Sequence, residues 1–294
     1  MSSPSLCHLH SNRGPTGLNF KPSSEDIMSN RGYDPIKLAE STEKIVVDGN
    51  KRKYVQLGRP LRFYGGTTSA TEVGCNLRCK FCFSDQPVWN PKNTGKFYSP
   101  KEVFDGLVET ARRYGHTIIS ASASEGTIGR EHLFELLDLV EQSEFVYILE
   151  TNGMTLGQDP ELVQQLAKYK RLHVRVSIKG CNEEEFHRLT GANREAYGLP
   201  YEALRMLISA GVSCNACLMV SFSDVASVAS AKDRLHQLHP GILKSLELEK
   251  IKLFPKVFLR LANSDLLANR GVSCVGKDSK STRSESAGLE GFVG

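Results

Sequence analysis

Residues 67–82 read TTSATEVGCNLRCKFC, and this stretch decides the fold. Its first part, Thr67 to Val73, is predicted to form a β-strand, and three cysteines follow it directly at Cys75, Cys79 and Cys82. The loops that follow the strands of a parallel α/β barrel form its active-site face. We therefore expect the three thiols to lie where the chemistry of the protein takes place.

Strands and helices alternate from Phe63 onward, which predicts an α/β fold. Strands are expected at 67–73, 117–121, 145–149, 173–178, 212–220 and 246–254. Helices are expected at 100–114, 131–142, 160–170, 183–189, 201–210 and 225–238. Six βα units in series favour a parallel sheet with helices outside, in the form of a partial (β/α)6 TIM-like barrel.

The residues before this barrel predict an N-terminal hairpin extension. A short helix is expected at Ile36 to Thr42. The tight-turn sequence Asp48-Gly49-Asn50 then stands between Ile45-Val46-Val47 and Lys53-Tyr54-Val55. The expected organisation is a disordered lead at 1–32, the helix and hairpin extension at 33–62, the barrel domain at 63–267 and a flexible tail at 268–294.

Composition excludes several classes of protein. The chain has 294 residues, of which 40% are hydrophobic and 24% charged, and its net charge is +4. This small surplus does not indicate nucleic-acid binding, which usually needs a concentrated basic face. No apolar run approaches the roughly 20 residues that span a bilayer, and the first residues lack a secretory signal. We expect a cytoplasmic protein without a membrane partner.

The three clustered thiols predict a metal site, because disulfides are rare in a reducing compartment. Structural zinc usually has four protein ligands, whereas three thiolates without a nearby fourth suit an iron–sulfur cubane with one iron left open. An open iron can bind a small molecule through an amine and a carboxylate. A zinc site that borrows a distant Cys or His stays open as the alternative.

The Cys-x-x-x-Cys-x-x-Cys pattern, with Phe81 before the last cysteine, resembles the motif of the radical S-adenosylmethionine superfamily. The resemblance extends over about Phe63 to Phe254. It implies an oxidoreductase with a [4Fe–4S] cluster on Cys75, Cys79 and Cys82. In this family, one electron from the cluster cleaves S-adenosylmethionine to methionine and a 5′-deoxyadenosyl radical, which abstracts hydrogen from substrate.

The same resemblance implies the residues that bind S-adenosylmethionine. Phe81 matches the residue whose backbone contacts the adenine. The family usually has Gly-Gly-Glu-Pro after its second strand, and Ala123-Ser124-Glu125-Gly126 stands here, without the two glycines and the proline. Glu125 matches the Glu of the family stretch and is expected to bind the methionine amino group, with Ser124 as a further polar contact. A solvated loop carboxylate is the alternative.

The strand at 173–178 alternates strictly, which aims Arg175, Ser177 and Lys179 away from the helices. The resembling family positions bind the methionine carboxylate and the ribose hydroxyls, so Ser177 and Lys179 are candidates for these roles. An edge strand with a solvated face is the alternative, above all for Arg175. The preceding strand ends in Glu150-Thr151-Asn152-Gly153, which is expected either to line the substrate site or to form an ordinary turn.

The remaining cysteines do not predict a second cluster. Cys214 and Cys217 are three residues apart on one predicted strand and so point to opposite faces. Cys181 is predicted to be a buried structural thiol, and Cys274 lies in the predicted tail.

The resemblance implies an external one-electron donor such as flavodoxin or ferredoxin. It leaves the substrate open among protein, RNA and metabolite. Residues 183–191 resemble a helix of glycyl-radical activating enzymes, which makes that activity one candidate. The competing class is a non-enzymatic metal protein, either a structural zinc module or an iron–sulfur electron carrier. Electron carriers usually ligate their cluster with four cysteines, and no fourth thiol is nearby.

Overall fold

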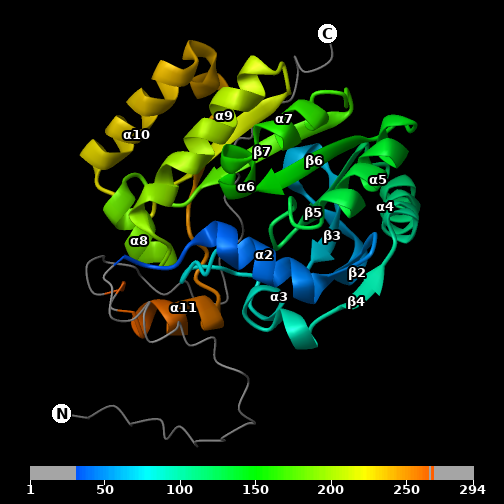
Figure 1. Ribbon diagram of the computed structural model, residues 1–294, viewed down its shortest axis with the longest axis horizontal. Helices are drawn as coiled ribbons and strands as arrows, with labels where there is room; N and C mark the ends of the chain where they lie inside the picture. The colour runs from blue at the N-terminus through cyan, green and yellow to red at the C-terminus, as the bar shows by residue number, and fades with distance from the viewer. Residues whose placement is uncertain (1–30, 265, 268–294) are drawn as a thin grey trace, which may run out of the picture.

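A computed structural model describes residues 31–264, 266 and 267, so most of the predicted lead and the whole predicted tail lie outside the described residues. Within the described part, nine strands form one mixed sheet (Figure 1). The predicted α/β architecture is confirmed.

The parallel part of the sheet contains the predicted barrel strands in sequence order. They are β3 (Thr67–Glu72), β5 (Ile118–Ser122), β6 (Val146–Thr151), β7 (Leu172–Ile178), β8 (Cys214–Met219) and β9 (Glu247–Glu249). No described residue of β9 pairs with β1 or β2, so the sheet stays open, as expected for a partial barrel. The carboxyl ends of these strands share one edge, and that edge positions the site.

Most helices lie on the outer side of this sheet (Figure 1). They are α4 (Pro100–Tyr114), α5 (Arg130–Glu141), α7 (Pro160–Leu166), α9 (Leu199–Ser209) and α10 (Val225–Leu238). Helix α4 shows why the sequence folds this way. Ser99 and Glu102 form a reciprocal capping box at its start, and Gly115 ends it in the left-handed conformation. Its apolar stripe, which includes Val103 and Leu107, is buried.

The N-terminal extension is part of the same sheet. Its helix α2 (Pro35–Val46) is longer than predicted, so β1 (Val47–Asp48) has only two residues before the expected turn. Strand β2 (Lys51–Leu61) pairs antiparallel with β1, β3 and β4 (Lys96–Tyr98). The predicted hairpin is therefore present, and its second strand extends the barrel sheet beside β3.

The last predicted strand is much shorter than expected. A strand is predicted over residues 246–254, but β9 pairs only over Glu247–Glu249, because β8 ends at Met219. Pro255 then starts α11 (Pro255–Ala262), a helix that the sequence pattern did not predict.

Short elements complete the described fold. They are α3 (Gln86–Trp89), α6 (Met154–Gln158), α8 (Glu183–Thr190) and the 3-10 turns at Phe63–Gly65, Pro91–Asn93, Arg194–Gly198 and Pro240–Ser245.

Candidate cluster site and cofactor-binding loops

The three cysteines lie on the loop that leaves the carboxyl end of β3. Cys79 is buried, and Cys75 and Cys82 are half-buried. Gly74 starts the loop with φ 95°, and a Cβ there would lie 2.9 Å from Thr42 Cγ2 of α2. Only glycine combines this backbone angle with such close packing, so Gly74 lets the loop turn beneath α2.

Main-chain contacts fix the course of this loop. The Arg78 amide donates to the Tyr33 hydroxyl at 2.7 Å, and that hydroxyl donates to the Thr190 carbonyl at 3.1 Å. The Lys80 amide donates to the Leu189 carbonyl at 2.9 Å. The loop therefore rests on the C-terminal end of α8.

Helix α11 closes the loop from the other side. Arg260 donates to the carbonyls of Lys80 and Cys82 and pairs with Asp85 at 3.2 Å. Its guanidinium also lies 5.6 Å from the ring centroid of Trp89. Sequence reasoning missed this clamp because it depends on α11.

The three sulfurs differ in their surroundings. Cys75 Sγ accepts from the Leu77 amide at 3.4 Å and lies 3.8 Å from Asn152 Nδ2. No hydrogen bond to Sγ of Cys79 or Cys82 is recorded within the described part of the chain. Burial, with the charge of Glu125 adding to it, raises the pKa of Cys75 to about 12, and burial also raises the pKa of Cys79. These thiols are therefore neutral at pH 7 until a metal displaces their protons.

The donors present fit an iron–sulfur cubane. Among residues 31–264, 266 and 267, no three His, Cys, Asp or Glu side chains converge on one point to hold a single ion. A cubane needs no such convergence, because each thiolate bonds a different iron. Asn76 Nδ2, buried in the same loop and without a partner among the described residues, is a further donor toward such a group.

The loop after β5 keeps a glycine-like backbone although its sequence lacks the family glycines. Ala123 has φ 78°, in the left-handed region that disfavours an alanine by about 1–2 kcal/mol. At Gly126 a Cβ would lie 2.6 Å from Leu149 Cδ1. The loop therefore packs tightly against β6, and a side chain at Gly126 would require Leu149 to shift.

Glu125 ties this loop to the end of β6. It is 0% exposed, and its Oε1 accepts from the Thr127 amide at 3.2 Å, the Thr127 hydroxyl at 2.8 Å and the Thr151 hydroxyl at 2.6 Å. Among the residues that the structure describes, its Oε2 accepts only from the Asn152 amide, at 2.8 Å. Because a carboxylate oxygen has two lone pairs, Oε2 has room for one further donor.

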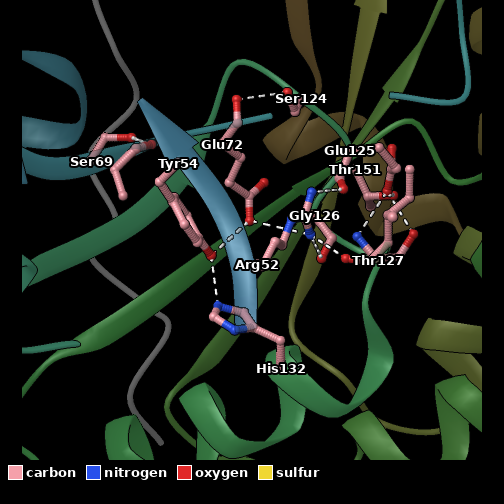
Figure 2. A network of polar contacts seen from close by, with 12 residues as sticks. Arg52, Tyr54, Ser69, Glu72, Ser124, Glu125, Gly126, Thr127, His132 and Thr151 are labelled. Carbon is pink, nitrogen blue, oxygen red and sulfur yellow. Dashed lines mark hydrogen bonds and ion pairs between the residues drawn. The ribbon is translucent and has the colours of Figure 1, made fainter. Parts of the chain in front are cut away.

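A buried arginine of β2 holds the same loop from behind (Figure 2). Arg52 is 1% exposed and donates to the carbonyls of Glu125 at 2.7 Å, Gly126 at 3.3 Å and Ile128. Glu72 of β3 lies 3.5 Å from the guanidinium and balances its charge. Sequence reasoning missed Arg52. Its only signal is that it alternates with Lys51 and Lys53, which puts it on one face of the strand with Tyr54.

Tyr54 and His132 extend this arrangement to α5 (Figure 2). His132 Nδ1 lies 2.8 Å from the Asn50 carbonyl, which can only accept, so Nδ1 carries the ring proton. Nε2 then accepts from the Tyr54 hydroxyl at 2.9 Å, which leaves Glu72 at 3.4 Å as the weaker partner of that hydroxyl. Burial lowers the pKa of His132 to about 4, so the ring is neutral at pH 7.

Strand β7 alternates as its sequence predicts. Val174, Val176 and Ile178 are fully buried in the apolar core. Arg175 lies on the opposite face, where it donates to Glu247 at 2.8 Å and 2.9 Å and to Ser177 at 3.2 Å.

The inner face of the sheet carries further charges beside Arg175. Lys179 lies 3.8 Å from Glu249 of β9, and Cys217 of β8 lies 2.8 Å from the Arg175 guanidinium. Burial opposes ionisation of Glu247, but Arg175 holds its pKa below the usual range. Burial raises the pKa of Glu150 of β6, which Arg175 opposes.

The structure brings several predicted site residues together. The Glu125 amide donates to the Gly74 carbonyl at 3.0 Å, which joins the β5 loop to the cysteine loop. Lys179 is close enough to Cys79 for its charge to favour the thiolate. Ser124 donates to the Glu72 carbonyl at 2.8 Å, so its hydroxyl faces β3. The Phe81 ring packs 5.6 Å from that of Phe222.

The other described cysteines do not form a second group. Cys217 shares the inner face with Arg175, whereas Cys214 lies beside Val174 in the ladder and faces outward. Cys181 is buried and donates to the Met219 carbonyl at 3.7 Å. The prediction that Cys214 and Cys217 point to opposite faces is confirmed, and Cys274 lies outside the described residues.

Comparison with known proteins identifies the family. A family model described as the Radical SAM superfamily matches residues 71–224, just over half of the chain. The chain belongs to the radical SAM superfamily, whose members are enzymes. No curated protein matches the chain.

The fold is similar to that of SuiB, a protein of known structure, and two further structures match at lower TM-scores. SuiB of Streptococcus suis with S-adenosylmethionine bound is 16% identical, with a TM-score of 0.51 over 62% of this chain and 40% of that chain. The enzyme anSMEcpe with bound AdoMet is 19% identical, with a TM-score of 0.43 over 66% of this chain and 57% of that chain. TYW1 with a lysine-pyruvate adduct is 16% identical, with a TM-score of 0.44 over 69% of this chain and 73% of that chain. The chain thus spans about two fifths of SuiB.

None of the described helices is both long enough and apolar enough to cross a membrane.

Proposed function

We propose that this protein is a radical SAM enzyme that holds a [4Fe–4S] cluster on Cys75, Cys79 and Cys82. The observation that carries the proposal is the meeting of the three-cysteine loop with the Glu125 loop at the carboxyl edge of the parallel sheet. When bound, the cluster and S-adenosylmethionine supply reductive cleavage to methionine and a 5′-deoxyadenosyl radical. The chain supplies the binding groups and excludes water.

Glu125 is the proposed acceptor for the methionine ammonium. Its Oε2 accepts a single hydrogen bond from the described part of the chain, and a charge-assisted bond from an ammonium adds to that. Arg52 restrains the loop through its carbonyls, so the carboxylate is held in place before the ligand arrives. Ser124 belongs to the same loop and is proposed as a supporting residue.

Lys179 and Ser177 are the proposed partners of the methionine carboxylate and ribose. The only ion pair of Lys179 within the described residues is a loose one, 3.8 Å from Glu249, so an incoming carboxylate can compete for the ammonium. Ser177 accepts from Arg175 and keeps its own hydroxyl proton for donation. The backbone of Phe81 is the proposed contact for the adenine.

The substrate is proposed to be a protein, an RNA or a metabolite, with activation of a glycyl-radical partner as one candidate. A one-electron donor such as flavodoxin or ferredoxin is the proposed reductant, and the cytoplasm the proposed location. The competing function is that of a non-enzymatic metal protein, which binds zinc or carries electrons.

Anaerobic reconstitution of the full chain with iron and sulfide tests the proposal. We expect about four irons per chain, and release of 5′-deoxyadenosine after addition of dithionite and S-adenosylmethionine. Cys79→Ala is expected to lose the cluster, whereas Cys214→Ala, which changes an outward-facing thiol, retains it. Zinc without iron in the purified protein, or full iron in Cys79→Ala, would contradict the assignment.

A second variant tests the ammonium site. Glu125→Gln keeps the size of the side chain but removes its charge, so we expect weaker S-adenosylmethionine binding with the iron content unchanged. Equilibrium dialysis with labelled S-adenosylmethionine measures this. Equal affinity in Glu125→Gln and the unaltered protein would remove Glu125 from the site.

A further inference from the structure

Two asparagine side chains are buried against the first cysteine. Asn76 is 0% exposed and Asn152, at the end of β6, is 5% exposed. Asn152 Nδ2 donates to Asn76 Oδ1 at 2.7 Å and lies 3.8 Å from Cys75 Sγ. We refer to Asn76 and Asn152 as the amide pair.

The surrounding hydrogen bonds fix which way both amides face. Asn152 Oδ1 accepts from the Met154 amide at 3.1 Å, and a backbone N–H can only donate. Asn152 must therefore turn its Nδ2 toward Asn76 and Cys75, and Asn76 must present its oxygen in return. The orientation that places an N–H group beside the Cys75 sulfur is thus required by the network.

This arrangement leaves Asn76 Nδ2 buried without any acceptor in the described part of the chain. An unsatisfied buried donor costs about 1–3 kcal/mol, so such groups usually have a partner. Asn76 directly follows Cys75 in the cysteine loop. The acceptor that fits is a sulfur of a group bound by that loop, since cluster sulfurs accept N–H bonds.

The hydrogen-bond donors near the three cysteines are also concentrated at Cys75. Cys75 Sγ has N–H groups of Leu77 and Asn152 near it, whereas no hydrogen bond to the sulfurs of Cys79 and Cys82 is recorded within residues 31–264. The Leu77 donor belongs to the backbone. The donors that a side-chain change can remove are those of the amide pair.

We infer that the amide pair donates N–H···S hydrogen bonds at the cluster and thereby raises the reduction potential of the cluster. Asn152 donates to the Cys75 thiolate, and Asn76 donates to a sulfur of the cluster itself. The inference rests on the proposed function. Reduction adds one negative charge, and donors that point at the sulfurs stabilise this more negative state more than the oxidised one. The amide pair is therefore a set of positioning residues that tunes how readily the cluster accepts its electron.

The test is a redox titration of the reconstituted protein, without S-adenosylmethionine, followed by electron paramagnetic resonance of the reduced cluster. Asn152→Leu keeps the bulk of the side chain and removes the donor. We expect its reduction equilibrium constant to fall about tenfold, which is about 59 mV for a one-electron couple. Asn152→Asp keeps the acceptor for the Met154 amide and adds a negative charge, so we expect a larger fall.

Asn76→Leu removes the second donor and provides an independent variant if Asn152→Leu binds iron poorly. The matched control is Asn93→Ala, whose exposed side chain bonds Asn90. Resonance Raman spectra of the oxidised cluster give a second measurement. We expect the iron–sulfur bands to shift in D2O in the unaltered protein and to shift less in both leucine variants.

The outcomes separate this inference from the proposed function. If the unaltered protein binds no iron–sulfur cluster, the proposed function fails and the inference fails with it. If the variants hold full iron and keep the potential and deuterium shifts of the unaltered protein, only the inference is overturned. A potential that falls in Asn152→Leu and in Asn76→Leu, but not in Asn93→Ala, supports it.

Discussion

Arg52 and Arg175 are two largely buried arginines on the same sheet, and they stabilise different kinds of structure. Arg52 lies on the outer face of the sheet and donates hydrogen bonds to the main-chain carbonyls of one loop, and Glu72 balances its charge. Arg175 lies on the inner face, and its partners are the side chains of Glu247, Ser177 and Cys217. Main-chain partners give a fixed loop, whereas side-chain partners can move to meet a ligand.

The largest effect is expected from Arg52→Met. This change leaves Glu72 as an uncompensated buried charge and removes donors from the loop carbonyls, so we expect the free energy of unfolding to fall by about 3–5 kcal/mol. Urea denaturation of the cluster-free protein, followed by circular dichroism, measures this. A loss below about 1 kcal/mol would show that Arg52 does not hold the loop.

His132, which bonds Tyr54 beside Arg52, is expected to make the stability of the protein depend on pH. Its pKa is about 4 in the folded protein, against 6.5 for an unperturbed histidine, so the unfolded chain binds more protons between these values. Stability contributed by the neutral ring is therefore present above pH 6.5 and falls by up to about 3 kcal/mol as the pH approaches 4.

His132→Gln is expected to flatten this part of the stability curve, measured by urea denaturation at a series of pH values. His236→Gln, which changes an exposed histidine of α10, is the control. Identical slopes for His132→Gln and the unaltered protein would mean that another group causes the loss at low pH.

A smaller effect is expected from Arg175→Met. Glu247, its main partner, is partly exposed and keeps donors from Tyr64 at 3.0 Å and Asn215 at 2.9 Å. We therefore expect the free energy of unfolding to fall by about 1–2 kcal/mol. If Arg175→Met lost as much stability as Arg52→Met in the same denaturation experiment, the two arginines would not differ in how firmly they hold the fold.

The smallest effect is expected on the surface. Arg113 and Glu109 of α4 form an ion pair at 2.9 Å, but their side chains are 66% and 73% exposed. Arg113→Ala should change the free energy of unfolding by no more than about 0.5 kcal/mol. This variant is the exposed control for the two buried arginines. A change above about 1 kcal/mol would mean that loss of an exposed arginine also destabilises the fold.

Local patterns account for what the sequence predicted well. The helix at 100–114 was predicted correctly because the apolar stripe and the cap that define a helix are properties of neighbouring residues. The cysteine loop was found in the same way, from three thiols at short spacing after a strand. The open parallel barrel followed from six alternating units, since few topologies accommodate them.

Features that depend on distant partners were not predicted. A strand was predicted over residues 246–254, but a strand forms only where its neighbour offers a partner, and β8 ends at Met219. The burial of Arg52 depends on carbonyls that follow it by more than 70 residues. The left-handed backbone of Ala123 contradicts the preference of alanine, so no local rule indicates it.

The contact between Arg260 and the Cys82 carbonyl has a consequence for how the protein is made. The two residues are 178 positions apart, so the ribosome adds Arg260 to the chain about 10–35 s after it has added Cys82. During that interval the nascent chain displays three thiols without their final support. The proposed cluster is therefore expected to bind after α11 has been synthesised, when the cysteine loop has its final support.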